Sequence, residues 1–262
     1  MNHGKKLKEY NKIFRRIRIP RKFCLYGLSD IGLTPMFYIV YVVISKANAA
    51  SRDVTITVCR IMDERGKKYE LRRNNLFTEV IQALSYLIDI GMITIDKPIS
   101  DIGFKTELHV TVNDSMAHIT TDYFDLNYNE FRKIIRSCPL KNPEYAVMLY
   151  IYIASHLYNR SDWGFQSFYE SRDNTCKTLG ISRYRYDTYT DYLDKTCVIR
   201  KWKSGVILNR NGYAVHVPNI YTLYRKDSIN IYWQSLKDLT GISDEKLLNE
   251  LVARGKERSK KT

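Results

Sequence analysis

Arg183, Tyr184 and Arg185 follow Ser182 directly, and Thr188 comes one helical turn after Tyr184. A guanidinium group can donate two parallel hydrogen bonds to the O6 and N7 atoms of guanine. A tyrosine ring can pack on a sugar or on a thymine methyl group. The first three side chains would lie in the first turn of a helix, and Thr188 would fall on the same face as Tyr184 one turn further on. Residues of these types at this spacing are suited to reading the base edges of DNA.

The flanking residues predict the turn and helix that would position these side chains. A helix over residues 171–179 is expected to end at Gly180, because glycine readily adopts the positive φ of a helix terminus. Ser182 can then cap a second helix, over residues 182–196, by accepting a backbone hydrogen bond. Tyr186, Tyr189 and Leu193 recur at spacings of three and four and predict its buried face. This pattern is typical of a helix-turn-helix.

The rest of the second half predicts the elements of a winged helix. Two helices are expected at residues 127–137 and 144–158, a strand begins at residue 197, and residues 213–217 alternate like its returning strand. The ribbon between these strands is polar and basic and would form the wing. Cations of the helix before the turn and of the wing are expected to contact phosphates: Lys177, Lys201, Lys203 and Arg210.

The first half follows the same order of elements. Helices are expected at residues 34–50, 57–66 and 74–90, and paired strands at residues 92–95 and 107–112, with a wing over residues 97–106. The side chains at the entrance of its third helix can read adenine and guanine: Arg72, Arg73, Asn74 and Asn75. The apolar residues 36–44 support a different interpretation, in which this domain forms a dimer seam instead of binding DNA.

We therefore expect an α+β fold, mainly helical, with two winged helix-turn-helix domains in tandem and additional C-terminal helices. The predicted boundaries are a basic N-terminal arm (residues 1–22), a first winged helix (23–113), a linker (114–126), a second winged helix (127–226) and a C-terminal segment (227–262). Within the last segment, helices are expected at residues 228–238 and 243–254.

The net charge of +14 indicates a polyanionic partner, and most of it lies in the two tails. Residues 1–22 hold nine Lys or Arg and one acid, and residues 252–262 hold five Lys or Arg and one acid. The tails thus carry net charges of +8 and +4, which leaves +2 for the residues between them. They are expected to be either arms that contact phosphates or solubilising ends.

The sequence lacks the motifs of other classes of chemistry. There is no G-x-x-x-x-G-K-[S/T] phosphate loop, the five histidines are isolated, and no serine or cysteine nucleophile motif is present. The five cysteines are scattered without a C-x-x-C pair, which favours reduced thiols in the cytoplasm. The longest apolar runs are shorter than the roughly 20 residues that span a bilayer, and no signal peptide is evident. We expect no catalytic residues, metal, cofactor or membrane partner.

Residues 146–199, with Tyr-Ile-Tyr-Ile-Ala-Ser near the start and Leu-Gly-Ile-Ser-Arg in the middle, resemble winged-helix domains of replication initiators and replisome organisers of Gram-positive plasmids and phages. The tandem plan over residues 23–220 is similar to that of two-winged-helix plasmid initiators. The resemblance implies a first domain that mediates dimer contacts and a second that binds repeated sites in double-stranded DNA at an origin. It also implies recruitment of replication proteins such as a helicase or its loader.

Two other functions stay open. A winged-helix transcriptional regulator would use the same residues to bind DNA, and sequence separates it poorly from an initiator. A DNA-nicking enzyme would use one of the 21 tyrosines as its nucleophile. The plainest structural interpretation of Arg183 and Arg185 is that they are solvated helix charges paired with Asp187 or Asp191.

Overall fold

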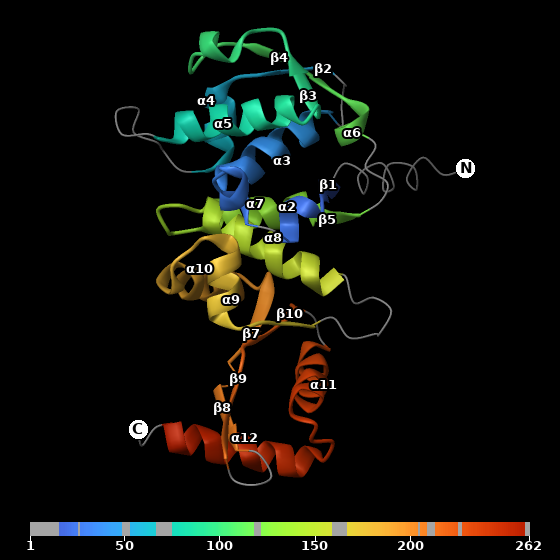
Figure 1. Cartoon of the computed structure of the whole chain (residues 1–262), viewed down its shortest axis with the longest axis vertical. Helices are drawn as coiled ribbons and strands as arrows, with labels where there is room; N and C mark the ends of the chain where they lie inside the picture. Colours follow the sequence, from blue (N-terminus) through green and yellow to red (C-terminus); the bar gives the residue numbers. More distant parts are fainter. Residues whose placement is uncertain are drawn as a thin grey trace, which may run out of the picture. The chain divides into compact units, whose positions relative to one another are not determined.

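The structure is a computed structural model, and it describes residues 16–25, 27–48, 53–66, 75–117, 122–158, 167–203, 205–208, 213–224 and 227–259. The fold is mixed α and β and mainly helical, with small antiparallel sheets, as predicted (Figure 1). The chain divides into two compact units, residues 1–151 and residues 152–262. The division falls inside one helix, α8 (Glu144–Tyr158), rather than at the predicted linker.

Unit 1 contains a layer of helices against a three-stranded sheet. In chain order these elements are α3 (Met36–Asn48), β2 (Asp53–Ile56), α4 (Val58–Glu64), α5 (Asn75–Asp89), β3 (Ile93–Ile95) and β4 (Leu108–Val112). Strand β4 lies between β2 and β3 and is antiparallel to both. Thr57 caps α4 by accepting a hydrogen bond from the Arg60 amide, and Gly91, with a φ of 67°, follows α5. The helices and strands predicted for this half are confirmed. The predicted wing contains a short 3₁₀ helix, η2 (Ile99–Asp101).

Helix α3 supplies the centre of the unit 1 core. All nine residues from Met36 to Ile44 are buried. Phe37 meets the rings of Phe23 and Tyr86 edge to face, with centroids 5.0 Å and 6.1 Å away. Because the chain itself covers these apolar side chains, residues 36–44 do not provide the exposed dimer seam that the sequence suggested.

A second sheet in unit 1 corrects two predicted boundaries. Strand β1 (Arg16–Pro20) pairs antiparallel with β5 (Tyr123–Asn127), and both Ile17 and Ile19 of β1 are buried. Residues 16–20 are therefore part of the fold and not of a free basic arm. The predicted linker, residues 114–126, contains helix α6 (Asp114–Ala117) and most of β5. Residues 1–15 of the predicted arm lie outside the described residues.

Three further helical elements complete unit 1. Two short ones, α2 (Lys22–Leu25) and η1 (Leu28–Ile31), follow β1, and α7 (Tyr128–Ser137) follows β5. The end of α4 packs closely on α7, because a Cβ atom at Gly66 would stand 3.1 Å from Cγ2 of Ile135. Gly66 also has a φ of 77°, a conformation that other residues rarely adopt, so the position favours glycine.

A buried ion pair joins the end of α4 to the start of α8. Nε of Arg65 donates to Oε2 of Glu144 at 2.8 Å, and Nη2 donates to Oε1 at 3.2 Å. The same Nη2 donates to the backbone oxygen of Lys141 at 2.9 Å. The two side chains are only 6% and 5% exposed. Glu144 is the first residue of α8, where a carboxylate also interacts favourably with the helix dipole.

Unit 2 repeats the plan of unit 1. After α8 come β6 (Ser167–Tyr169), α9 (Arg172–Leu179), α10 (Arg183–Lys195), β7 (Ile199–Trp202) and finally β10 (Ile220–Leu223). Strand β10 lies between β6 and β7 and is antiparallel to both. In each case the order is helix, strand, helix, helix, strand, strand, and the third strand lies between the first and the second. Strand β6 was not predicted, because its burial does not alternate: both Ser167 and Phe168 are buried.

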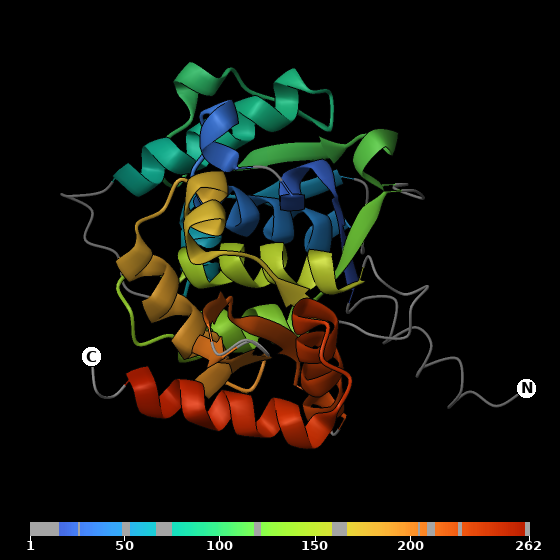
Figure 2. The same ribbon diagram turned by 60° about the horizontal axis from the view of Figure 1, so that its bottom comes forward.

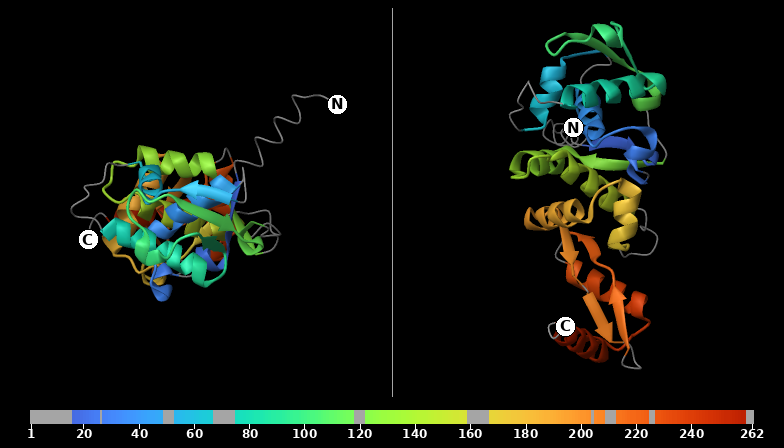
Figure 3. Two further views of the ribbon diagram at one scale, coloured as in Figure 1. Left: turned by 90° about the horizontal axis from the view of Figure 1, so that it is seen from above. Right: turned by 60° about the vertical axis from the view of Figure 1, so that its left-hand side comes forward.

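A two-stranded ribbon stands where the sequence predicted a simple wing. Strand β8 (Gly205–Leu208) pairs with β9 (Ala214–Val217), and the ribbon continues the β7–β10 pair (Figure 3, right). The predicted returning strand, residues 213–217, thus forms as β9 but pairs with β8. The strand that returns beside β7 is β10, which was not predicted. Pro218 lies between β9 and β10, where it cannot donate a backbone hydrogen bond.

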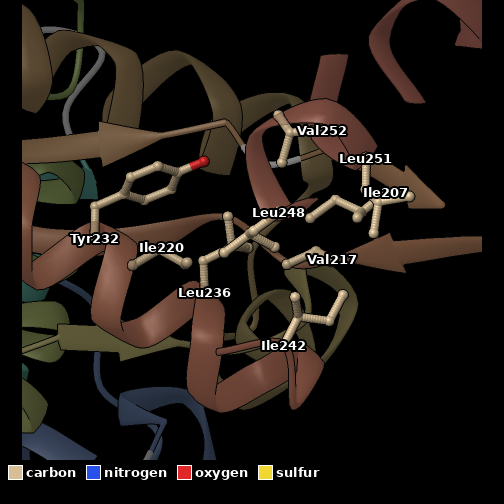
Figure 4. Packing of buried hydrophobic residues seen from close by; sticks show 9 residues of the cluster. All are labelled: Ile207, Val217, Ile220, Tyr232, Leu236, Ile242, Leu248, Leu251 and Val252. Carbon is tan, nitrogen blue, oxygen red and sulfur yellow. The ribbon is translucent and has the colours of Figure 1, made fainter. Parts of the chain in front are cut away.

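The two predicted C-terminal helices form and cover this ribbon. They are α11 (Ser228–Thr240) and α12 (Glu245–Ser259), and α12 crosses the ribbon as an uninterrupted helix (Figures 1 and 2). The C-terminal cluster between them contains nine buried residues (Figure 4): Ile207, Val217, Ile220, Tyr232, Leu236, Ile242, Leu248, Leu251 and Val252. The ribbon therefore supports α11 and α12 through one face and is not a free wing.

Candidate nucleic-acid interface

Helices α9 and α10 are joined by a short turn that the sequence predicted correctly. Gly180 ends α9 with a φ of 63°, and the backbone N–H of Ile181 donates to the Cys176 oxygen at 3.0 Å. The Ser182 hydroxyl accepts a hydrogen bond from the Arg185 amide at 3.2 Å. These two caps fix where α10 begins and hence where Arg183, the first residue of α10, stands.

The buried face of α10 fixes the helix against strand β10. The predicted residues Tyr186, Tyr189 and Leu193 are all buried. The hydroxyls of Tyr186 and Tyr221, the latter in β10, lie 2.5 Å apart and share a buried hydrogen bond. Burial raises the pKa of Tyr186 well above its usual value and that of Tyr221 to about 12. Both phenols are thus neutral at physiological pH, and this side of α10 is a rigid support.

The start of α10 presents its predicted base-reading side chains to solvent. Arg183, Tyr184 and Arg185 are exposed, and 78% of Tyr184 is accessible. Nη2 of Arg183 donates to Oδ2 of Asp173 at 2.6 Å, with both side chains more than half exposed. An ion pair this accessible contributes little to stability, so a phosphate or a base edge can replace Asp173 at low cost. Thr188 is half-buried.

The aspartates of α10 are neutralised by cations from α9 and β7. Asp187 pairs with Arg172 at 2.9 Å, and Asp191 accepts a hydrogen bond from Lys201 at 2.7 Å. Lys203 lies 3.7 Å from the same Asp191 oxygen. The plain interpretation of the sequence paired Arg183 and Arg185 with these aspartates, but Arg183 pairs with Asp173 of α9.

Lys201 has a different role from the predicted phosphate contact. Its side chain is only 3% exposed, and Nζ also donates to Oγ1 of Thr190 at 2.8 Å. In the alternating pattern of β7, Lys201 lies on the buried side together with Ile199. It therefore holds α10 on β7 and cancels the charge of Asp191, and it does not reach a DNA phosphate in this conformation.

The Lys201–Asp191 contact predicts a pH dependence. Burial alone would raise the pKa of Asp191, but hydrogen bonding to Lys201 and the charges of Lys201 and Lys203 together lower it. The stabilisation is therefore fully present above the usual Asp pKa of 3.8 and is lost as the pH falls through the lowered value. In urea titrations, Asp191→Asn should be less stable than the native protein at pH 7, and this difference should disappear in acid. Asp89→Asn, an exposed control in α5, should show no such trend. A deficit for Asp191→Asn that is constant down to the acid limit would contradict a role of its charge.

Of the remaining residues of unit 2 that were predicted to contact phosphates, two are exposed and one lies outside the described residues. Lys177 is exposed on α9, and Lys203 is 71% exposed just after β7. Arg210 lies outside the described residues. From Arg172 to Lys203 the chain carries eight Lys or Arg and four Asp, so this segment keeps a net charge of +4 after its internal pairing.

The corresponding helix of unit 1 has a different character. Arg72, Arg73 and Asn74 lie outside the described residues, and Asn75 is exposed as the first residue of α5. From Asn75 to Asp89, α5 contains no Lys or Arg. Its Glu79 is half-buried and accepts a hydrogen bond from the Thr34 hydroxyl at 3.0 Å. Helix α5 therefore has no counterpart of Arg183 and Arg185, the cations in the first turn of α10.

Two arginines near α10 were missed by the sequence analysis. Arg172 begins α9 and pairs with Asp187 of α10. Arg200 lies over the rings of Trp202 and Tyr224, 5.5 Å and 5.0 Å from their centroids. The strand period gives a signal for Arg200, because it places Arg200 and Trp202 on the same face of β7. Sequence spacing gives no signal for the pairing of Arg172 with Asp187.

Two comparisons of the sequence with known proteins found no relative. The models of known protein families include none that matches the chain, and the curated proteins include none with significant similarity. Among the described residues, no helix combines the length and apolar content needed to cross a membrane. Within the same ranges, no three His, Cys, Asp or Glu side chains gather where they could hold a metal ion.

Proposed function

We propose that this chain binds double-stranded DNA sequence-specifically and reads bases through the start of α10. The main observation in support is that Arg183, Tyr184 and Arg185 are exposed at the start of α10. Two caps fix the position of this helix start. The order of helices and strands around α10, with β10 between β6 and β7, supports a winged-helix assignment. Unit 1 has the same order, which supports a tandem pair.

In this proposal the start of α10 enters the major groove of the duplex. Arg183 exchanges Asp173 for a base edge or a phosphate, and Arg185 contacts a neighbouring base. Lys177 and Lys203 contact the sugar-phosphate backbone and fix the register of the helix. Lys201 keeps Asp191 from repelling the phosphates, because its ammonium group is within hydrogen-bond distance of that carboxylate.

Within DNA-binding proteins, we assign the chain to replication initiation on a plasmid, a phage or another mobile element. The support is the resemblance of residues 146–199 to initiator winged helices, together with the repeated plan of the two units. Such a protein would bind repeated origin sites, would recruit a helicase or its loader, and would act as a homodimer at some stage. A transcriptional regulator is the alternative, since it would use the same surface.

Among the described residues, the tyrosines with a shifted pKa are poorly suited to act as a nucleophile. A tyrosine that attacks a phosphate is activated by deprotonation, which a low pKa favours. Burial instead raises the pKa values of Tyr38, Tyr152 and Tyr186. We therefore propose binding without chemistry.

Selection from a random duplex library, followed by footprinting on the DNA next to the gene, tests this function. We expect protection of directly repeated sites beside an AT-rich tract. A palindrome over a promoter would favour a regulator over an initiator. Failure to enrich any duplex would overturn the proposal of sequence-specific binding.

A further inference from the structure

Three elements of unit 1 converge on Tyr128, the first residue of α7. Nζ of Lys46, in the last turn of α3, donates to the Tyr128 hydroxyl at 2.5 Å and lies 4.1 Å from the centre of its ring. The hydroxyl in turn donates to Oε1 of Glu64, at the end of α4, at 2.6 Å. The tyrosine ring is buried, so these contacts fix the relative placement of α3, α4 and α7.

Other cations, outside this hydrogen-bond network, also lie near Tyr128. Arg132 lies over the same ring, with Cζ 5.8 Å from its centre. Burial lowers the pKa of Lys46; Glu64 opposes this effect, and Arg132, Arg60 and Arg136 add to it. We name the group of these six residues the Tyr128 cluster: Lys46, Arg60, Glu64, Tyr128, Arg132 and Arg136. It contains four cations and a single carboxylate.

The cations of the cluster are not held in ion pairs by described acids. Among the described carboxylates, none forms an ion pair with Lys46, Arg60, Arg132 or Arg136. Nε of Arg132 is buried and has no hydrogen-bond partner in the structure. Lys46, Arg60 and Arg136 are exposed. Like charges gathered in this way destabilise a fold, and an anion bound among them would relieve the repulsion.

We propose that the Tyr128 cluster binds the phosphate backbone of DNA and provides the DNA contact of unit 1. The inference rests on the proposed function and moves the contact away from α5, which contains no Lys or Arg. The exposed guanidinium groups of Arg60 and Arg136 stand on two different helices, an arrangement suited to a row of phosphates. Contacts of this kind add affinity for any duplex and carry no base preference.

The test uses the double variant Arg60→Gln/Arg136→Gln, which leaves Lys46, Tyr128 and Arg132 in place and is expected to fold. Lys141→Gln/Lys246→Gln, at two exposed positions outside the cluster and outside both basic tails, removes the same charge elsewhere and is the control. The binding constant for a duplex of arbitrary sequence is measured from about 0.05 to 0.2 M salt. We expect the salt slope to fall by about 0.9 for each lost phosphate contact, and the affinity to fall roughly tenfold at about 0.15 M salt. The control should keep the slope of the native protein.

Three other outcomes would overturn the inference. An unchanged slope in the Arg60/Arg136 variant, while Arg183→Ala still weakens specific binding, would overturn this inference and leave the proposed function standing. Equal losses in the variant and the control would show an effect of net charge alone and would also overturn it. If the native protein binds no duplex at all, both the inference and the proposed function fail.

Discussion

Replacing Arg65 with alanine is expected to lower the free energy of unfolding by about 3–5 kcal/mol, the range for breaking a buried ion pair by removing one partner. The substitution leaves Glu144 buried, with 5% of its side chain exposed, and without the guanidinium that binds both of its oxygens. It also removes the hydrogen bond to the Lys141 backbone. The loss should therefore separate the end of α4 from the start of α8.

Urea unfolding followed by circular dichroism measures this effect in the whole chain. Arg254→Ala breaks an exposed pair with Glu250, whose side chains are 65% and 64% exposed, and should cost far less. The double variant Arg65→Met/Glu144→Leu removes both charges together and should recover most of the stability. A loss for Arg65→Ala no larger than that for Arg254→Ala would show that the buried pair does not hold α4 to α8.

Replacing Arg183 or Arg185 with alanine is expected to weaken binding to the selected DNA site by about 1–3 kcal/mol each. Both side chains are exposed at the capped start of α10, so neither substitution removes a buried contact. Base preference should relax at the positions that each arginine reads. Affinity for unrelated duplexes should change much less, because cations elsewhere also contact phosphates.

Competition titrations of the selected site against random duplex give both affinities in one experiment. Lys246→Ala and Arg254→Ala each remove one positive charge from α12 and serve as matched controls, with little effect expected on the ratio of specific to random binding. If Arg183→Ala and Arg185→Ala both kept the native ratio, α10 would not be the element that reads sequence.

Local signals made the α9–α10 region predictable from sequence. Gly180 and Ser182 determine the turn through backbone conformation and a cap, and both effects depend on residues a few positions away. The buried face of α10 follows from the spacing of Tyr186, Tyr189 and Leu193. For the same reason helices α3, α4 and α5 and strands β3 and β4 of unit 1 were found.

Contacts between distant residues explain what the sequence did not reveal. The Arg-Ile-Arg-Ile alternation of β1 was hidden in a basic segment, and its partner β5 lies more than a hundred residues away. The charge of Lys201 suggested a phosphate contact, although its position in β7 places it on the buried side beside Asp191. The ribbon of β8 and β9 looked like a free wing because its cover, α12, comes later in the chain. The Tyr128 cluster unites α3, α4 and α7 in a way that no sequence motif records.

Site-specific photocross-linking tests the central claim, that the start of α10 meets DNA, most directly. A photoreactive phenylalanine replaces Tyr184, which is 78% exposed on α10, or Ile229, which is 42% exposed on α11. Each protein is irradiated with the selected duplex and with random duplex. We predict cross-links from position 184 that map to bases of the selected site, and none from position 229. No cross-link from position 184 to a duplex that the protein demonstrably binds would contradict the account.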